Sequence, residues 1–133
     1  MTQLFTQAQT FLLLHNGSEG ESGKDHRPVV KLFTPNSNYT WLLTECTPGN
    51  LTSACGLSNW DVSQPTLGRI DLQELATFRS VPGLSLERDP DFQPTHPISV
   101  YAAAAAKLGF ITTDKTILDA IAESLQATAI RSV

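Results

Sequence analysis

Three carboxylates and one imidazole lie close together in the sequence, and these groups could bind a metal ion. Glu87, Asp89 and Asp91 alternate along one segment, and His96 follows five residues later. Oxygen ligands of this kind suit Mg²⁺, Mn²⁺ or Ca²⁺, and a bound ion could support hydrolysis. The competing interpretation is a strand end and a turn, with Arg88 balancing the charge. Because no EF-hand or HExxH spacing is present, a metal-assisted hydrolase is only the alternative hypothesis.

The sequence shows no recognisable motif for nucleophilic catalysis, phosphate binding or cysteine chemistry. The sequence contains no GxSxG nucleophile elbow and no Gly-rich phosphate loop of Walker or Rossmann type. Cys46 and Cys55 are nine positions apart, which fits no CxxC or zinc-knuckle spacing. We expect them to be small buried thiols in adjacent strands. The sequence therefore predicts no cofactor and favours a non-enzymatic protein over an enzyme.

A short basic stretch raises the question of nucleic acid. Lys24, Arg27 and Lys31 precede aromatic residues of a predicted strand, and such a combination could hold a single strand. The chain has 9 Lys and Arg residues against 13 Asp and Glu residues, giving a formal net charge of −4. Since nucleic-acid binders normally carry a basic surplus, nucleic acid is not expected to be the main ligand.

The favoured candidate surface is aromatic. Tyr39 and Trp41 are expected on one face of a strand, because successive side chains point to opposite faces. Trp60 lies in an irregular segment after the next strand. Exposed Trp and Tyr side chains are typical anchors of protein interfaces, although the same residues could equally form core. Together with Arg88, which could pair with a carboxylate or a helix end, they make up the candidate binding set.

Hydrophobic periodicity and turn chemistry predict the elements that position these residues. Strands are expected over residues 29–33, 39–46, 51–57 and 66–70, and residues 84–87 alternate like a further strand. Helices are expected over residues 3–15, from Asp71 onward, over 98–108 and over 114–131. This order indicates a single α+β domain over 1–133, with a meander-like antiparallel sheet of about four strands. An N-terminal helix, a short middle helix and two C-terminal helices would pack against it.

The ends and faces of the helices can be predicted in more detail. The apolar stripe of the first helix comprises Leu4, Phe5, Ala8, Phe11, Leu12 and His15. Asn16-Gly17 would end this helix before a polar loop over 16–27. Asp71 and Glu74 have the spacing of a capping box. Thr113 is the expected N-cap of the last helix, whose apolar stripe comprises Ile117, Leu118, Ile121, Leu125 and Ile130.

Nothing in the sequence predicts export or membrane insertion. The apolar patch over residues 11–14 has no basic leader, and no run approaches the roughly 20 apolar residues of a membrane span. We therefore expect a cytoplasmic protein without a membrane partner.

Several segments together resemble a known bacterial family. Residues 28–35 (PVVKLFTP) and 40–45 (TWLLTE) are similar to the opening signature of an uncharacterised family, a domain of unknown function common on plasmids, integrative elements and phages. Residues 66–75 and 83–92 are similar to its later "ELGYVSLSEL" and "GLPVERDLYFKP" segments. The resemblance covers about 3–112, although residues 58–65 depart from the family pattern. The helix over 114–131 extends beyond the usual end of the family.

The resemblance implies an accessory protein of a mobile genetic element, and it carries over no catalytic residue. We therefore expect a small binding protein that acts through contact with a protein partner, with host defence (restriction or CRISPR) as a candidate target. The helix over 114–131 would pack on its own domain or form a homodimer contact. Deleting residues 113–133 is expected to leave a folded domain of lower stability or solubility.

Overall fold

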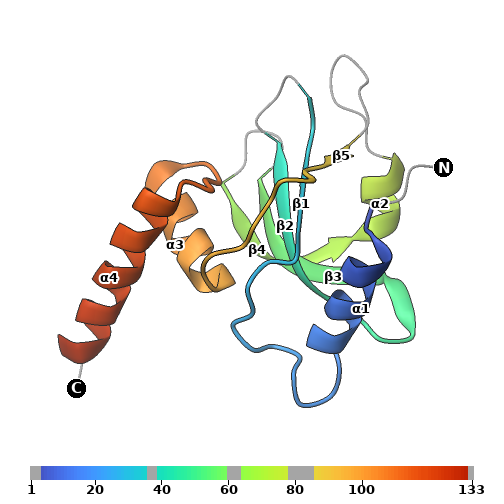
Figure 1. Cartoon of the computed structure of the whole chain (residues 1–133), viewed down its shortest axis with the longest axis horizontal. Helices are drawn as coiled ribbons and strands as arrows, with labels where there is room; N and C mark the ends of the chain where they lie inside the picture. Colours follow the sequence, from blue (N-terminus) through green and yellow to red (C-terminus); the bar gives the residue numbers. More distant parts are fainter. Residues whose placement is uncertain (1–3, 36–38, 60–63, 78–85, 132–133) are drawn as a thin grey trace.

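The computed structural model describes residues 4–35, 39–59, 64–77 and 86–131, and it shows an α+β fold (Figure 1). Five antiparallel strands form one sheet in the order β4-β3-β2-β1-β5. The strands are β1 (Val30–Phe33), β2 (Thr40–Thr47), β3 (Asn50–Asn59), β4 (Thr66–Asp71) and β5 (Glu87–Arg88). The helices are α1 (Gln7–Asn16), α2 (Leu72–Thr77), α3 (Ile98–Leu108) and α4 (Lys115–Arg131). The predicted fold class and the four helices are confirmed.

The sheet is a meander from β1 to β4, and β5 adds a short edge strand beside β1. Asp89 continues this pairing, because its backbone N–H donates to the carbonyl of Lys31 at 3.0 Å. At the opposite edge, β4 is exposed at five of its six positions, and only Ile70 is buried. The alternation over residues 84–87 predicts a further strand here, and the structure describes it over Glu87–Arg88.

Both faces of the sheet are covered, so the central strands are buried on both sides. Trp41 and Leu43 of β2 face α1 and α2, whereas Leu42 between them faces α3. The first core cluster comprises Leu13, Val30, Leu32, Trp41, Leu43, Cys46, Ala54, Ile70, Leu72, Leu75 and Leu86. The second core cluster comprises Leu42, Leu57, Ile98, Val100, Tyr101, Ala104, Ala105 and Leu118. Strand β2 therefore belongs to two hydrophobic layers at once.

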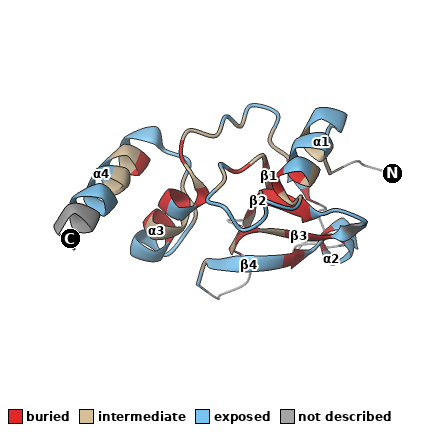
Figure 2. Cartoon of the chain, turned by 90° about the horizontal axis from the view of Figure 1, so that it is seen from below, coloured by how far each residue is buried: buried red, intermediate tan, exposed pale blue. Residues whose placement is uncertain are grey.

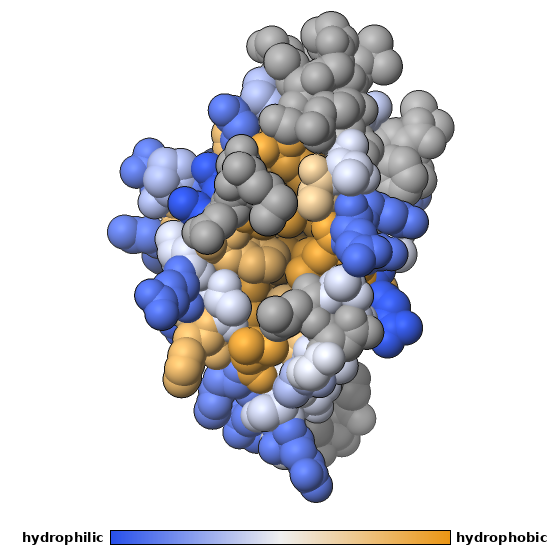
Figure 3. All heavy atoms as spheres, turned by 90° about the vertical axis from the view of Figure 1, so that its right-hand side faces the viewer, coloured by the Kyte–Doolittle hydropathy of each residue, from blue (hydrophilic) through white to orange (hydrophobic). Residues whose placement is uncertain are grey.

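Helix α1 begins at Gln7, later than predicted, and the face that it buries is not the one predicted from its apolar stripe. Thr6 is its N-cap, and a capping box joins the Thr6 and Gln9 side chains to each other's backbone N–H groups. Leu13 and Asn16 face the sheet, where the Asn16 amide donates to the carbonyl of Thr44, and Phe11 and Leu12 are 79% and 46% exposed. The expected inward orientation of Phe11 and Leu12 is wrong. Figure 3 views the molecule from the side that carries α1 and α2.

The polar loop after α1 connects the sheet to α3. The buried Glu45 carboxylate of β2 accepts from Ser22 Oγ at 2.7 Å and from the Gly23 N–H at 3.2 Å. A few residues later, Asp25 accepts from the backbone N–H and the hydroxyl of Ser99 in the first turn of α3. Pro97, the N-cap of α3, has no side-chain cap bond of its own, so Asp25 supplies the anionic acceptor from a distant segment.

Helix α3 agrees with its sequence prediction, and α4 differs at its start. Helix α3 spans Ile98–Leu108, and Gly109 ends it in the left-handed conformation at φ 86°. The N-cap of α4 is Asp114 rather than Thr113, because Asp114 Oδ1 accepts from the N–H groups of Thr116 and Ile117. A carboxylate is the stronger acceptor at the positive end of a helix.

The beginning of α4 packs on its own chain, which is the first of the two arrangements expected for it. Leu118 is fully buried against α3, and Ile121 and Ala122 are half-buried beside it. Leu125 is 41% exposed, and Ile130 lies outside the residues whose side chains are described. Figure 2 shows α4 extending away from the sheet, with its burial confined to the early turns. Across the described ranges, no helix is both long and apolar enough to span a bilayer.

Candidate functional site

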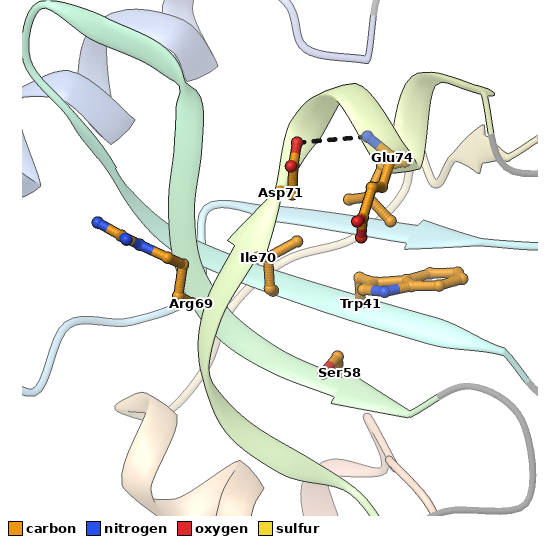
Figure 4. A pocket seen from close by; sticks show the side chains of 7 residues that line it. Trp41, Ser58, Arg69, Ile70, Asp71 and Glu74 are labelled. Atoms are coloured by element: carbon orange, nitrogen blue, oxygen red, sulfur yellow. Dashed lines mark hydrogen bonds between the residues drawn. The ribbon is translucent and has the colours of Figure 1, made fainter.

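A pocket of about 200 Å³ opens where α2 follows edge strand β4 (Figure 4). It lies on the face of the sheet that carries the first core cluster. Its lining residues come from β2, β3, β4 and α2: Trp41, Ser58, Arg69, Ile70, Asp71, Glu74 and Leu75. We call this site the Trp41 pocket.

Two glycines face each other across the β3–β4 pair. Ser58 pairs with Thr66 and Ala54 pairs with Ile70, and between these two rows Gly56 pairs with Gly68. A Cβ added at Gly68 would meet no atom within 4 Å, whereas a Cβ at Gly56 would lie 2.0 Å from the carbonyl oxygen of Leu42. The close approach of β2 therefore requires glycine at Gly56, a position that sequence reasoning did not single out.

The Trp41 pocket is apolar below and acidic at its rim. Trp41, Ile70 and Leu75 are buried and form its apolar part, whereas Asp71 and Glu74 are exposed. In Figure 4 the Glu74 carboxylate points toward the Trp41 indole. The rim is rigid because α2 begins there. Asp71 Oδ1 accepts from the N–H groups of Gln73 at 2.8 Å and Glu74 at 3.3 Å, so the N-cap half of the predicted capping box is confirmed.

The lining suits binding better than catalysis. Its polar side chains are a hydroxyl, two carboxylates and one guanidinium, and no imidazole or thiol lines it. The Ser58 hydroxyl already donates to the carbonyl of Thr66 at 3.3 Å. A nucleophile needs a base within hydrogen-bond reach, and among the described residues no hydrogen bond joins Ser58 to either carboxylate.

The predicted binding set comprises Tyr39, Trp41, Trp60 and Arg88, and the structure describes three of these four residues. Tyr39 and Trp41 face the same side of the sheet, as alternation predicts, and both pack in or against the first core cluster. Trp41 is only 2% exposed, so it belongs to the core and reaches the surface only at its pocket. Arg88 lies on β5 opposite Leu32, and Trp60 lies outside the described residues.

The residues of the alternative metal site make separate local contacts in the described structure. Asp89 pairs with Lys31 at 3.4 Å, and its Oδ1 accepts from the Asp91 backbone N–H at 2.9 Å. Glu87 is exposed on β5, and His96 faces α4. In the described parts of the chain, no three His, Cys, Asp or Glu side chains could hold an ion together.

The basic stretch is partly neutralised by ion pairs. Lys24 lies 3.3 Å from Glu21 and Lys31 lies 3.4 Å from Asp89. Lys31 also lies above the Phe33 ring, 6.0 Å from its centroid. Of the aromatic residues in this hypothesis, Trp41 is buried, and Phe33 and Tyr39 are half-buried.

A polar connection between α4 and the segment before α3 was not predicted. His96 is 9% exposed, with Nε2 2.8 Å from Asp119 Oδ1 and Nδ1 2.7 Å from Thr95 Oγ1. The Tyr101 hydroxyl accepts from the Thr95 N–H at 3.2 Å. Lys115 bonds the second Asp119 oxygen at 2.8 Å. The Asp119 carboxylate therefore connects α4 to the segment before α3, and Leu118 packs α4 on α3.

The stability conferred by Asp119 is expected to depend on pH. The hydrogen bond from Lys115 and then that with His96 hold the pKa of Asp119 below its usual value. A lowered folded-state pKa stabilises the fold above the unfolded pKa of about 3.9, and this stabilisation is lost as pH falls through the folded pKa. The difference in unfolding free energy between wild type and Asp119→Asn should therefore be largest above pH ~5 and shrink below pH ~4.

Urea unfolding at several pH values measures this difference. Glu123→Gln on the same helix is the control, because its carboxylate is exposed. A difference between wild type and Asp119→Asn that stays constant from neutral to acidic pH would contradict the linkage.

The two cysteines lie in adjacent strands, as expected, on β2 and β3. Cys46 is buried in the first core cluster, whereas Cys55 is half-buried rather than buried. Burial and the nearby Cys55 and Glu45 raise the pKa of Cys46 to about 11. Burial also raises the pKa of Cys55.

Cys46 should therefore be unreactive in the folded protein. Because the thiolate is the reactive form, Cys46 in a Cys55→Ser variant should react with a thiol reagent at pH 8 at least about 100-fold more slowly when folded than in urea. The Cys46→Ser variant reports on Cys55 as the matched control. Equal folded and unfolded rates for Cys46 would contradict its burial.

Comparison with known proteins identifies one family. A family model described as "Protein of unknown function (DUF2958)" matches residues 4–112. These residues include the whole sheet, α1 to α3 and the Trp41 pocket, whereas α4 lies beyond them. No curated protein and no solved structure matches the chain.

Proposed function

This chain belongs to the DUF2958 family of proteins of unknown function, and from that premise we propose that it is a small non-enzymatic binding protein of a mobile genetic element. It acts in the bacterial cytoplasm through contact with a protein partner. Its target is a component of host defence, either a restriction system or a CRISPR effector. The resemblance to proteins carried by plasmids, integrative elements and phages supports the mobile-element context.

The observation that carries the binding function is the Trp41 pocket. It combines an apolar floor with an exposed acidic rim, and it lies within the residues that the family model matches. Aromatic side chains in small desolvated pockets are typical centres of protein interfaces.

Residues of the family-like segments mostly hold the scaffold. Lys31 and Asp89 join β1 to the residue after β5 by an ion pair and a backbone hydrogen bond. Glu45 fixes the loop that precedes β1. Lys31, Asp89 and Glu45 already make structural contacts. The acidic rim of the Trp41 pocket makes fewer such contacts, so it is the better candidate for the surface that contacts a partner.

Phage plating tests the proposal. The chain is expressed in three otherwise identical hosts, which carry a restriction system, a CRISPR system or neither. Expression is expected to raise plating on at least one defended host toward the level on the undefended host. Unchanged plating on both defended hosts, with the protein present at normal levels, would overturn the counter-defence function.

Two variants connect this effect to the site. Glu74→Lys reverses the charge at the pocket rim and should abolish the rise in plating, because it repels the partner. Glu123→Lys makes the same charge change on α4, away from the pocket, and should leave the rise unchanged. Equal loss in both variants would show that the acidic rim is not the contact site.

A further inference from the structure

We propose, building on the binding function above, that the Trp41 pocket receives one basic side chain, an arginine or a lysine, from the protein partner. Recognition would combine a dry contact with the aliphatic part of this side chain and an ionic contact with its charged end.

The size of the pocket fits a single side chain. Its volume is about 200 Å³, whereas small-molecule sites usually measure about 300–1,000 Å³. Edge strand β4 forms one border, and five of its six residues are exposed. A partner can therefore approach from this edge without displacing any described strand or helix.

The arrangement of apolar and acidic groups matches a long cationic side chain. Trp41, Ile70 and Leu75 offer apolar contact to a methylene stem, and basic side chains commonly bury their stems while the charge stays near water. An indole also attracts a cation that lies over its ring. Glu74 and the second oxygen of Asp71 then lie at the rim, where the charged end would emerge.

The negative charge at the rim is available to a partner. Among the described residues, the Glu74 carboxylate forms no hydrogen bond or ion pair, and only Oδ1 of Asp71 is engaged. Arg69 is the one basic residue in the lining, and Figure 4 shows its guanidinium pointing away from Glu74 and Trp41. Within the described ranges, the pocket therefore presents two carboxylates beside an apolar floor, with no cation paired to Glu74.

An NMR titration with small probes tests this inference on the full chain. The probes are N-acetyl-arginine methylamide, the lysine equivalent and the citrulline equivalent, which has the shape of arginine without its charge. The arginine probe, the lysine probe or both should shift the Trp41 indole N–H and the backbone signals of Glu74 and Leu75. The citrulline probe should shift them far less.

Matched variants locate the ionic contact. Glu74→Gln should weaken binding of the arginine probe about fivefold, which corresponds to one partly exposed ion pair. Glu123→Gln should bind it as wild type does. Ser58→Leu enlarges a side chain of the lining and should weaken all probes, which tests the pocket independently of charge.

Three outcomes would overturn the inference. Neither cationic probe shifts the pocket signals, the citrulline probe shifts them as strongly as the arginine probe, or the shifts cluster outside the pocket. These results are distinguishable from a failure of the proposed function. Cationic probes that bind without any plating effect would reject counter-defence alone, whereas a plating effect that survives Glu74→Lys would reject the basic side chain alone.

Discussion

Gly56→Ala is expected to destabilise the fold by at least about 3 kcal/mol, the upper end of the usual cost of overpacking. The new Cβ would lie 2.0 Å from the carbonyl oxygen of Leu42 and 2.9 Å from the Cα of Leu43. Both atoms belong to the backbone of β2, so no side-chain rotation relieves the contact. Strands β2 and β3 would have to move apart at the centre of the sheet, where both core clusters meet.

Gly68→Ala is the matched control with the opposite expected sign. Gly68 is the register partner of Gly56 on β4, but a Cβ there has open space around it. Alanine in a strand interior is favoured over glycine by roughly 0.5–1 kcal/mol, so this variant should be slightly more stable. Urea unfolding measures both variants. Similar losses in the two would show that glycine at Gly56 is not required by close approach of the strands.

Leu118→Ala is expected to cost about 2–5 kcal/mol, the range for removing a fully buried leucine. Leu118 is 0% exposed and packs in the second core cluster with Tyr101 and Ala105. Its loss would leave a cavity between α3 and α4. Amide exchange of α4 should accelerate as well, since Leu118 and the Asp119 contact with His96 hold the same turn.

Leu125→Ala on the same helix provides the comparison. Leu125 is 41% exposed, so its truncation should change the unfolding free energy by less than about 1 kcal/mol. Unfolding in urea and exchange of the α4 amides distinguish the two variants. Equal small losses would mean that α4 is a dispensable tail, against the expectation that deleting residues 113–133 lowers stability.

Elements specified by neighbouring residues could be predicted from the sequence. The alanine-rich segment before Gly109 forms α3, because helix propensity and a left-handed glycine cap act within a few residues. The strands of the meander follow from β-favouring runs separated by turn residues. For the same reason, alternation placed Tyr39 and Trp41 on one face without any tertiary information.

Contacts between distant segments could not be read in this way. Asp25 caps a helix that begins more than 70 residues later, and His96 meets Asp119 only because α4 folds back on α3. The Trp41 pocket likewise has a lining from β2, β3, β4 and α2, whose residues meet only when the sheet and α2 have packed together. The inward face of α1 was mistaken because contacts with the sheet, such as that of Asn16 with the Thr44 carbonyl, decide which side of the helix is buried.

The sequence by itself determined the fold class, the order of the elements and the family, because each follows from local propensity or from short motifs. Tertiary structure decided which charged residues meet, which aromatic residues are buried and where a pocket opens. These features depend on strand register and on the packing of layers, in which a shift of one residue moves a side chain to the opposite face. Local sequence patterns carry no record of that choice.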